Sequence, residues 1–498
     1  MAFQTPDVYV REQATLPPSI AEVETAIPAF VGFTEKMLDD DQKALSLRYD
    51  ESDKTKLVAD SIKPRRITSM LEYHQYFGGD YKEALLVKLL QADPKIEDYR
   101  VDSILTADKQ SLGALPKFFL YQAVSHFFAN GGGACYIVPV GLANATQTVR
   151  ASDFQAGLAA VEQIEEVTML LTPEAVTLGA EDFYLNVAAK ALEHAKKFPS
   201  RVALIDVVEN PPKGTVSATI SADAQALRDR LSNRDHLKHA AAYYPYLMTS
   251  IARSAGNPQV VTFTLKDDPA NPGKQIEEEL ATTSLDKLAG TARHTLIQQR
   301  LSRLYLVLPP CAAIAGVYSQ TDAQHGVWKA PANVGLAQVI GPHIPITNDQ
   351  QKALNVDVTG GKSINAIRAF TGKGTLVWGA RTLDGNDNEW RYVNVRRLFN
   401  MIEESARKSI NQFVFDPNSP FTWLKIKAMV ESYLRNLWQQ GALFGDKPEK
   451  AFFVNVGLGK TMTQQDILEG LMKVEIGIAA NRPAEFIVLT FTHKPMEA

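Results

Sequence analysis

The closest approach to a nucleotide-binding motif in this sequence is the run GLGKT at 457–461. A phosphate-binding loop needs a further glycine five positions before the glycine of its Gly-Lys pair, so that backbone N–H groups can cradle the phosphates. Val454 occupies that position, and the run TGKGT at 371–375 fails on the same count. We therefore expect a strand-to-helix turn at 457–461 and no nucleotide site.

A second glycine run, at 130–133, lies between a predicted helix and a predicted strand. Phosphate loops have the opposite order, because the N-terminus of the following helix supplies the favourable field. We expect these glycines to end the helix. An enzyme built on an α/β sheet would need polar groups at the carboxyl ends of strands, and Asp206 is the only acidic residue placed that way. No Ser/His/Asp grouping at a known spacing accompanies it, so we predict no catalytic residues and no enzyme.

Histidine and cysteine do not cluster in this sequence as metal ligands do. His236 and His239 stand three residues apart, without a cluster of carboxylates or cysteines beside them, which predicts a solvated helix face. Cys135 and Cys311 each lie in an apolar run, where a buried and inert thiol is expected. The sequence therefore predicts no metal site and no cofactor.

Length and composition are those of an ordinary globular protein with several domains. The chain has 498 residues, of which 45% are hydrophobic and 22% charged, so about two to four domains are expected. The net charge of −4 argues mildly against direct nucleic-acid binding. No apolar run approaches the ~18 residues that span a bilayer, and the N-terminus lacks the pattern of a signal peptide. We expect a chain that is cytoplasmic on synthesis and does not insert into membranes.

Helices and strands alternate from about 116 to 208, which predicts an open parallel α/β sheet. The predicted strands are 135–140, 167–171 and 201–208. The predicted helices are 120–129, 153–164 with Ser152 as its N-cap, 181–198 and 222–231. Residues 251–300 interrupt this alternation with a strand at 260–265 inside an otherwise polar, helix-prone stretch. We expect a surface insertion there.

Strand patterns stand at both ends of the chain. Residues 6–12 alternate apolar and polar side chains, and a proline-rich link at 15–19 separates them from the next strand, at 25–34. Two apolar strands, 473–478 and 485–493, close the chain. An isolated short strand needs a sheet elsewhere, and an exposed apolar strand either pairs or aggregates. We therefore expect these terminal strands to pair.

Well-marked helices lie between these strands. A short helix is expected at 67–77, and a long one at 393–413. A second long helix has Ser419 as N-cap, Pro420 at its first position and Gly441 as its stop. Thr463 and Asp466 resemble a capping box that opens a short helix to about Leu471, after a strand at 452–456.

The pair Arg396–Arg397 lies near the start of the helix at 393–413, where positive charge opposes the helix dipole. A carboxylate within the fold would offset this effect, which favours a structural ion pair. A contact outside the chain stays open as the alternative.

Several segments, in order, resemble the contractile tail sheath family, which includes phage tail sheaths and the sheaths of extracellular contractile injection systems. PDVYVRE followed by TAIPAFVGFTEK resembles the family's N-terminal opening, and FFANGGGACYIVPV with the later AAYYPYL resembles its middle. The most recognisable segment is PPCAAIAGVYSQTDAQHGVWKAPAN, at 309–333. The C-terminal part is completed by INAIRAFTGKGTLVWGARTL, YVNVRRLFNMIEESARKSINQFVFDPNSPFTW and RPAEFIVLTF. The resemblance thins over 36–63, 93–115 and 251–303.

This resemblance implies a structural subunit of a contractile sheath. Such subunits stack as six-fold rings around an inner tube and contract to drive the tube into a target, with baseplate and terminal cap proteins as further partners. We expect a multidomain chain of α/β and α+β class. The family's core would be formed by the N-terminal strands plus the C-terminal part, with an open α/β middle domain and a surface insertion. The particle would be a phage tail or a tail-like device that lysis releases.

The resemblance also divides the chain into parts. These are a strand-exchange arm at 1–19, the N-terminal part of the core at 20–35, an outer variable region at 36–115, the middle domain at 116–350 with its insertion at about 251–303, the C-terminal core at 351–484, and a C-terminal arm strand at 485–498. In this family the two arms complete the sheets of neighbouring subunits. The residues expected to take part in this exchange are Val8, Tyr9, Val10, Arg11, Val474, Ile476, Phe486, Ile487, Val488, Leu489, Thr490 and Phe491. The residues expected to face the tube are Arg396, Arg397, Lys425 and Lys427.

Two other functions stay open at this stage. A tail-tube or baseplate protein with related arms is the first, although the large α/β middle and the GVWKAPAN segment weigh against it. An enzyme that uses Asp206 on the α/β sheet is the second.

Overall fold

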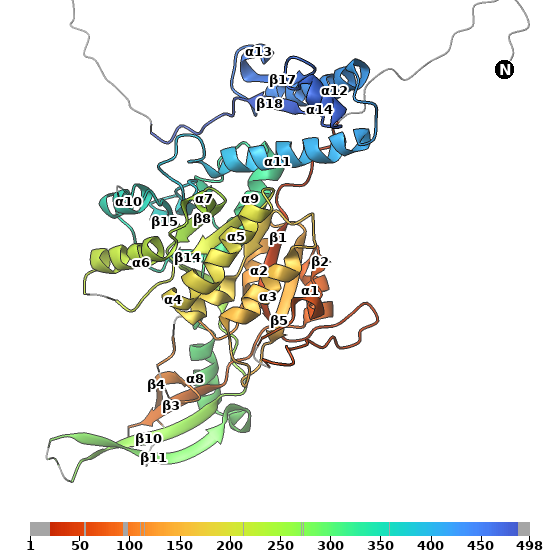
Figure 1. The fold of residues 1–498 in the computed structure, drawn as a ribbon. Helices are drawn as coiled ribbons and strands as arrows, with labels where there is room; N and C mark the ends of the chain where they lie inside the picture. Colours follow the sequence, from red (N-terminus) through yellow and green to blue (C-terminus); the bar gives the residue numbers. More distant parts are fainter. Residues whose placement is uncertain are drawn as a thin grey trace, which may run out of the picture. The chain divides into compact units, whose positions relative to one another are not determined.

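The structure is a computed structural model that describes residues 20–486, apart from 54–55, 93–97, 110, 114, 213, 270, 272 and 358. The chain divides into two compact units (Figure 1). The smaller unit contains residues 20–23 and 398–484, and the larger unit contains residues 24–397 with 485–486. Both units contain helices and strands, in agreement with the expected mixed class. None of the described helices is long and apolar enough to cross a membrane.

A nine-stranded sheet forms the centre of the larger unit. Its order across the described residues is β13 (Val334–Gly335), β16 (Gly374–Val377), β15 (Ile364–Phe370), β8 (Ala240–Tyr244), β7 (Val202–Asp206), β6 (Met169–Leu171), β1 (Pro28–Thr34), β5 (Cys135–Leu142) and β2 (Arg65–Ile67). The strands from β15 to β5 run parallel, and the parallel sheet predicted for 116–208 accounts for β5, β6 and β7 among them. β1 and β7 are buried along their whole length, which is typical of parallel strands covered on both faces.

The membership of this sheet crosses the boundaries expected from the sequence. β1, from the expected N-terminal part of the core, lies in the middle of the sheet between β5 and β6. β15 and β16, from the expected C-terminal core, extend the opposite side beyond β8. Strand pairing between segments far apart in sequence therefore defines this unit, and local patterns do not reveal it.

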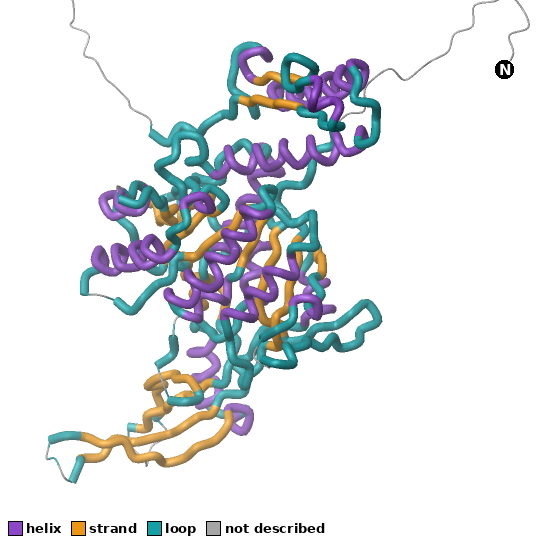
Figure 2. Tube along the Cα trace, in the orientation of Figure 1, coloured by secondary structure: helices purple, strands orange, loops and turns teal. Residues whose placement is uncertain are grey.

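Helices are layered over this sheet (Figure 2). They are α1 (Met70–Phe77), α2 (Leu120–Ala129), α3 (Ala151–Val161), α4 (Ala180–Asp182), α5 (Ala189–Lys197), α6 (Val216–Arg230), α7 (Arg234–Leu237), α9 (Cys311–His325) and α10 (Asn348–Asn355). A π-helical segment, Phe183–Ala188, joins α4 to α5, so the helix predicted at 181–198 is continuous but irregular.

Two local predictions about helix starts are wrong. The segment from 67 begins as strand β2, and α1 starts only at Met70, where the Ser69 side chain accepts a hydrogen bond from the Glu72 N–H. Helix α3 starts at Ala151 with Arg150 at the N-cap, so Ser152 is already inside the helix. By contrast, α2 ends as predicted, with Asn130 at the C-cap and Gly131 at a φ of 90°.

A four-stranded sheet forms a separate part of the larger unit, and its β10–β11 hairpin extends away from the main sheet (Figure 1). Its order is β11 (Gln275–Ser284), β10 (Gln259–Asp267), β3 (Leu85–Gln91) and β4 (Tyr99–Thr106), and α8 (Ala292–Leu301) packs against it. The insertion predicted at 251–303 is therefore only half of this sheet. Residues 275–284, which were expected to be helix-prone, form a strand because they pair with β10 along their whole length.

The third sheet of the larger unit has three described strands: β12 (Tyr305–Leu308), β9 (Leu247–Ala252) and β14 (Val339–Pro342). β14 and β13 are the only described strands in the stretch from Trp328 to Asn348, which is otherwise irregular.

The smaller unit is built on one long helix, α12 (Pro420–Gln439), which packs against β17 (Phe452–Val456). β18 (Val474–Ile478) pairs antiparallel with β17. α13 (Pro448–Ala451) and α14 (Gln464–Leu468) complete it, and α11 (Val393–Ile410) contains the boundary between the two units. Ser419 is the N-cap of α12 as predicted, although its side chain makes no capping hydrogen bond.

The GLGKT segment forms a turn after β17, with positive φ at Gly457 and Gly459. The predicted capping box follows it. The Thr463 side chain accepts from the Asp466 N–H, and the Asp466 carboxylate accepts from the Thr463 N–H. Hydrogen bonds from Lys473 and Thr463 lower the pKa of Asp466 to about 2.

Candidate interaction surfaces

The β17–β18 sheet is the described element closest to the predicted strand exchange. In the described part of the chain no third strand pairs with either of them, so each strand has an open edge. Phe452, Val454 and Val456 of β17 are buried on the α12 side. The opposite face is partly open, because Phe453 is 50% exposed and lies across from Gly477 of β18. Such an edge can accept a further strand.

The partner of β18 differs from the sequence expectation. The strands at 473–478 and 485–493 were expected to close the chain as a pair, but β18 pairs with β17. Residues 485 and 486 form no strand, and the rest of the segment lies outside the described residues. Residues 452–456, about twenty residues earlier, supply another apolar strand for β18, and the pairing of 473–478 with 485–493 stays a prediction.

The predicted exchange residues fall into two groups. Val474 and Ile476 lie in β18 and are partly exposed, and Phe486 is 74% exposed. The remaining exchange candidates, Val8, Tyr9, Val10, Arg11, Ile487, Val488, Leu489, Thr490 and Phe491, lie outside the described residues.

Lys425 and Lys427, expected to face the tube, lie on α12. Lys425 is exposed and its ammonium group lies 4.4 Å from the centre of the Phe421 ring, while Lys427 is 3.5 Å from a carboxylate oxygen of Glu431. On the same helix, Phe421 is 67% exposed and Leu424 is 66% exposed. A surface of this kind, apolar with basic residues at its margin, is typical of an interaction site. The sequence analysis did not single out these apolar residues.

Arg396 and Arg397 do not lie on such a surface. Both side chains are buried, with 4% exposure each. Arg397 forms an ion pair with Asp322 of α9, and its Nη2 also donates to the carbonyl oxygen of Thr25 at 2.9 Å. The Arg396 guanidinium lies 4.2 Å from the centre of the Trp390 ring. The structural ion pair is therefore the correct interpretation of Arg397, and the tube-facing position is wrong for both arginines in this structure.

Asp206, the candidate acid of an enzyme, has a structural position. It is 2% exposed and accepts a hydrogen bond of 2.8 Å from the N–H of Cys311, the first residue of α9. Burial raises its pKa to about 7. Cys311 and Cys135 are buried, as predicted, and burial raises the pKa of both thiols. An acid that caps a buried helix start is not accessible to a substrate.

Glu174 has a similar role that the sequence analysis missed. Its carboxylate accepts hydrogen bonds from the N–H groups of Phe33, Phe119 and Leu120, at 2.6–2.9 Å. Burial raises its pKa to about 7, against the lowering effect of these bonds. The only local signal was an acidic residue just after the strand at 167–171, and its partners are distant in sequence.

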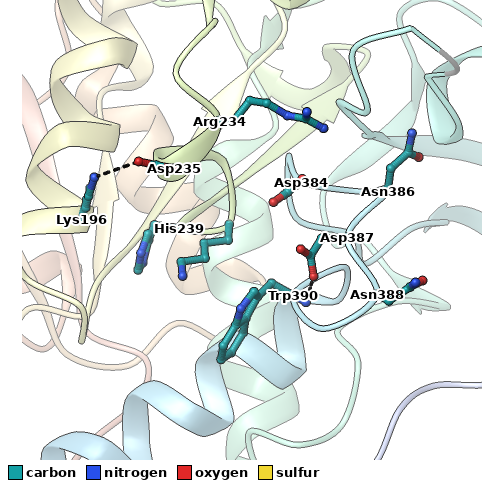
Figure 3. Close-up of a pocket in the computed structure, with 10 residues that line it drawn as sticks. Lys196, Arg234, Asp235, His239, Asp384, Asn386, Asp387, Asn388 and Trp390 are labelled. Atoms are coloured by element: carbon teal, nitrogen blue, oxygen red, sulfur yellow. Dashed lines mark hydrogen bonds and ion pairs between the residues drawn. The ribbon is translucent and has the colours of Figure 1, made fainter.

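A cavity of about 700 Å³ in the larger unit brings charged residues together (Figure 3). Three of its cations come from α5 and the segment around α7, and three carboxylates come from α7 and the loop after residue 383. They are Lys196, Arg234, Lys238, Asp235, Asp384 and Asp387. Lys196 and Asp235 pair at 3.6 Å. Opposite charges thus balance within the cavity. No group of three potential metal ligands occurs among the described residues.

His239 lies in the wall of this cavity and is 4% exposed, so the predicted solvated position is wrong for it. Burial, with the nearby charge of Arg396, lowers its pKa to about 3, so the ring is neutral. His239 precedes the amino end of β8, whereas open α/β sheets bind ligands outside the carboxyl ends of their strands. This geometry does not support the enzyme alternative.

The comparisons with known proteins point to one class. Residues 385–494 match the phage tail sheath C-terminal domain. The tail sheath protein of Vibrio phage KVP40 is 27% identical over 137 residues, which is 28% of this chain and 20% of that protein. The aligned part thus spans about a fifth of the length of this curated relative.

Two solved structures match almost the whole chain. A chain in the six-fold symmetrised cryo-EM structure of the anti-feeding prophage baseplate is 28% identical, with a TM-score of 0.61, and the match covers 99% of this chain and 100% of that one. A chain of the PVC sheath complex, an extracellular contractile injection system in the contracted state, is 27% identical with a TM-score of 0.59, over 99% of both chains. The fold is therefore that of contractile sheath proteins. This chain is similar to tail sheath proteins, and residues 385–494 match their C-terminal domain.

Proposed function

We propose that this protein is the structural subunit of a contractile sheath, which stacks as six-fold rings around an inner tube and contracts to drive the tube into a target. The observation that supports this most strongly is the fold match over 99% of the chain to a contracted sheath complex. The six-fold symmetry of the related baseplate structure supports the ring order. The balanced charge cavity and the structural position of Asp206 favour a role without catalysis.

The subunits are linked by exchange of terminal strands. Residues 1–19 and 485–498 are the arms, and the open edges of β17 and β18 are the sites that accept strands from neighbouring copies. Backbone ladders formed in this way can stay intact while compact units move as rigid bodies during contraction. Among the described exchange residues, Val474 and Ile476 lie on this sheet.

The inner tube contacts the smaller unit at the α12 surface, with Lys425 and Lys427 as its basic residues. Baseplate and terminal cap proteins bind the ends of the stack, and the chain binds neither nucleic acid nor membrane directly. The subunit is made in the cytoplasm and becomes part of a phage tail or a tail-like particle that is released on lysis. A sheath paralogue located at the baseplate is a second candidate, because one of the matched chains belongs to a baseplate structure.

Negative-stain electron microscopy of the expressed chain tests this function, and striated tubes are the expected result. Deletion of residues 1–14 should leave folded subunits that do not assemble. Val8→Asp with Val10→Asp puts charge on the apolar side of the exchanged strand and should prevent assembly, whereas Gln13→Asp adds charge to the arm outside the exchange residues and should still assemble. Sheaths of normal length from the deletion variant would contradict strand exchange. A soluble wild-type subunit that forms no tubes under any condition would contradict the sheath function.

A further inference from the structure

Glu485, the last residue before the exposed Phe486, is held by three side chains of the larger unit. Arg381 donates to it from Nη2 at 2.7 Å and from Nε at 3.0 Å. Asn355 Nδ2 donates to Oε1 at 2.9 Å, and the Tyr392 hydroxyl donates to Oε2 at 3.0 Å. Both carboxylate oxygens are thus satisfied within one subunit, by a guanidinium fork and two neutral donors.

The cation of this site is itself fixed. Arg381 has a side-chain exposure of 5%, and its Nη1 donates to the carbonyl oxygens of Asn355 and Gly385. The Asn365 side chain accepts from the backbone N–H of Arg381 at 2.7 Å and donates to its carbonyl oxygen at 2.8 Å. Groups other than Glu485 therefore hold the Arg381 guanidinium in its orientation toward Glu485. Burial alone would raise the pKa of Glu485, but the bonds from Arg381 and Asn355 outweigh it and lower the pKa.

The chain passes between the two units at three places, after residues 23, 397 and 484. On the larger-unit side of the first two, Thr25 and Arg397 are both bound to the carboxylate of Asp322. At the third, Glu485 is bound to Arg381. Each entry into or exit from the larger unit is thus fixed by an arginine–carboxylate pair whose arginine is buried.

We propose that Arg381, Asn355 and Tyr392 form a carboxylate clamp that holds Glu485 and so fixes the point from which the C-terminal arm leaves its own subunit. The inference rests on the proposed function, because the arm is residues 487–498 acting on a neighbouring copy. A fixed origin confines the arm to a small volume, and this raises its effective concentration at the accepting edge. Without the clamp the same strand starts from a variable origin and joins its partner less often.

The test compares the full-length wild type with Glu485→Gln, which keeps the shape of the side chain and removes its charge. Chymotrypsin cleavage after Phe486 reports the clamp in the free subunit, and tube yield by sedimentation and electron microscopy reports assembly. We expect cleavage about tenfold faster and a clear loss of tubes in Glu485→Gln, because charge-assisted bonds are lost from a desolvated arginine. Tyr392→Phe removes a single donor and should give an intermediate cleavage rate.

Glu181→Gln is the matched control, since it makes the same chemical change at an exposed position of the larger unit, outside the clamp and outside β17 and β18, and should leave cleavage and tube yield at wild-type values. Unchanged cleavage after Phe486 in Glu485→Gln, or tubes of normal yield and length from that variant, would overturn the clamp. If the wild type itself forms no tubes, the sheath function fails, and the cleavage rates still decide whether the clamp exists.

Discussion

Glu174 and Asp206 are two carboxylates in the larger unit that water does not reach, with exposures of 0% and 2%. Glu174 accepts from the first N–H groups of α2, and Asp206 accepts from the first N–H of α9. Helix starts leave backbone donors without partners, and a buried acceptor satisfies them. The same burial disfavours the charged form, so each pKa is raised to about 7. At both residues burial, which raises the pKa, thus opposes the hydrogen bonds, which lower it.

This conflict predicts a pH dependence of stability. Because the pKa of Glu174 is raised in the folded state, the fold binds more protons than the unfolded chain between about pH 4.5 and 7. The contribution is fully present below the unfolded pKa and is lost as the pH rises through the folded one. The free energy of unfolding should therefore fall as the pH rises over this range, by at most about 1.4 kcal/mol per pH unit for this group. Guanidinium unfolding at several pH values measures this slope.

Glu174→Gln removes the titrating group and should flatten this part of the pH profile. At the same time it leaves a buried N–H without an acceptor, at a cost of about 1–3 kcal/mol. Glu181→Gln, at an exposed position, is the matched control and should change stability by less than about 0.5 kcal/mol. An unchanged pH slope in Glu174→Gln would contradict the raised pKa.

Close contact between α2 and α9 is the element-scale feature on which the core of the larger unit depends. A Cβ atom added at Gly316 of α9 would lie 2.5 Å from the carbonyl oxygen of Phe127 and 2.9 Å from Cβ of Asn130. Only glycine allows the two helices to approach this closely. The same approach places the capped starts of both helices against the sheet, because α9 contacts β6 and β7, and α2 contacts β1.

Gly316→Ala should therefore destabilise the protein, even though alanine is the better helix former by about 1 kcal/mol. Forcing an extra methyl group into a packed core costs about 1–3 kcal/mol, which outweighs that gain. Thermal unfolding measures the change. Gly133→Ala, where the nearest atom to the new Cβ is Ser319 Oγ at 3.6 Å, is the control in the same region and should be tolerated. Equal stability of both variants would contradict this packing argument.

At the scale of the whole molecule the chain forms two compact units rather than one. The larger unit draws its main sheet from segments between 28 and 377, and the smaller unit is formed mostly by 398–484. Units with separate cores can unfold separately. In a sheath this separation would let each unit remain folded while contraction changes the contacts between subunits.

Leu434→Ala tests this independence. Leu434 of α12 has no exposed surface, and its truncation should cost about 2–5 kcal/mol in the smaller unit. We expect two unfolding transitions. Leu434→Ala should lower the midpoint only of the smaller unit's transition, which the fluorescence of Trp423 and Trp438 reports. Gly316→Ala should shift the other. A single transition that both substitutions shift equally would show that the units unfold together.

Local chemistry allowed a large part of this protein to be predicted from its sequence. The ends of α2, the position of β17, the N-cap of α12 and the capping box at Thr463 follow from residues within a few positions of one another. Hydrophobic spacing predicted the parallel sheet because each strand must bury both of its faces. The resemblance of several ordered segments to tail sheath proteins was also present in the sequence, and the comparisons confirm it.

Only the tertiary structure decided which distant residues meet. It buried Arg397 against Asp322, placed His239 in a cavity wall, paired β18 with β17 and brought Glu485 to Arg381. In the three pairings, the partners are separated by about twenty to more than one hundred residues. Helix or strand periodicity and helix caps relate only residues that are near one another in sequence, so these patterns could not predict the pairings. The sequence around a charged residue looks the same whether that residue faces solvent or a buried partner. Its role is fixed only when the fold determines the cost of removing it from water.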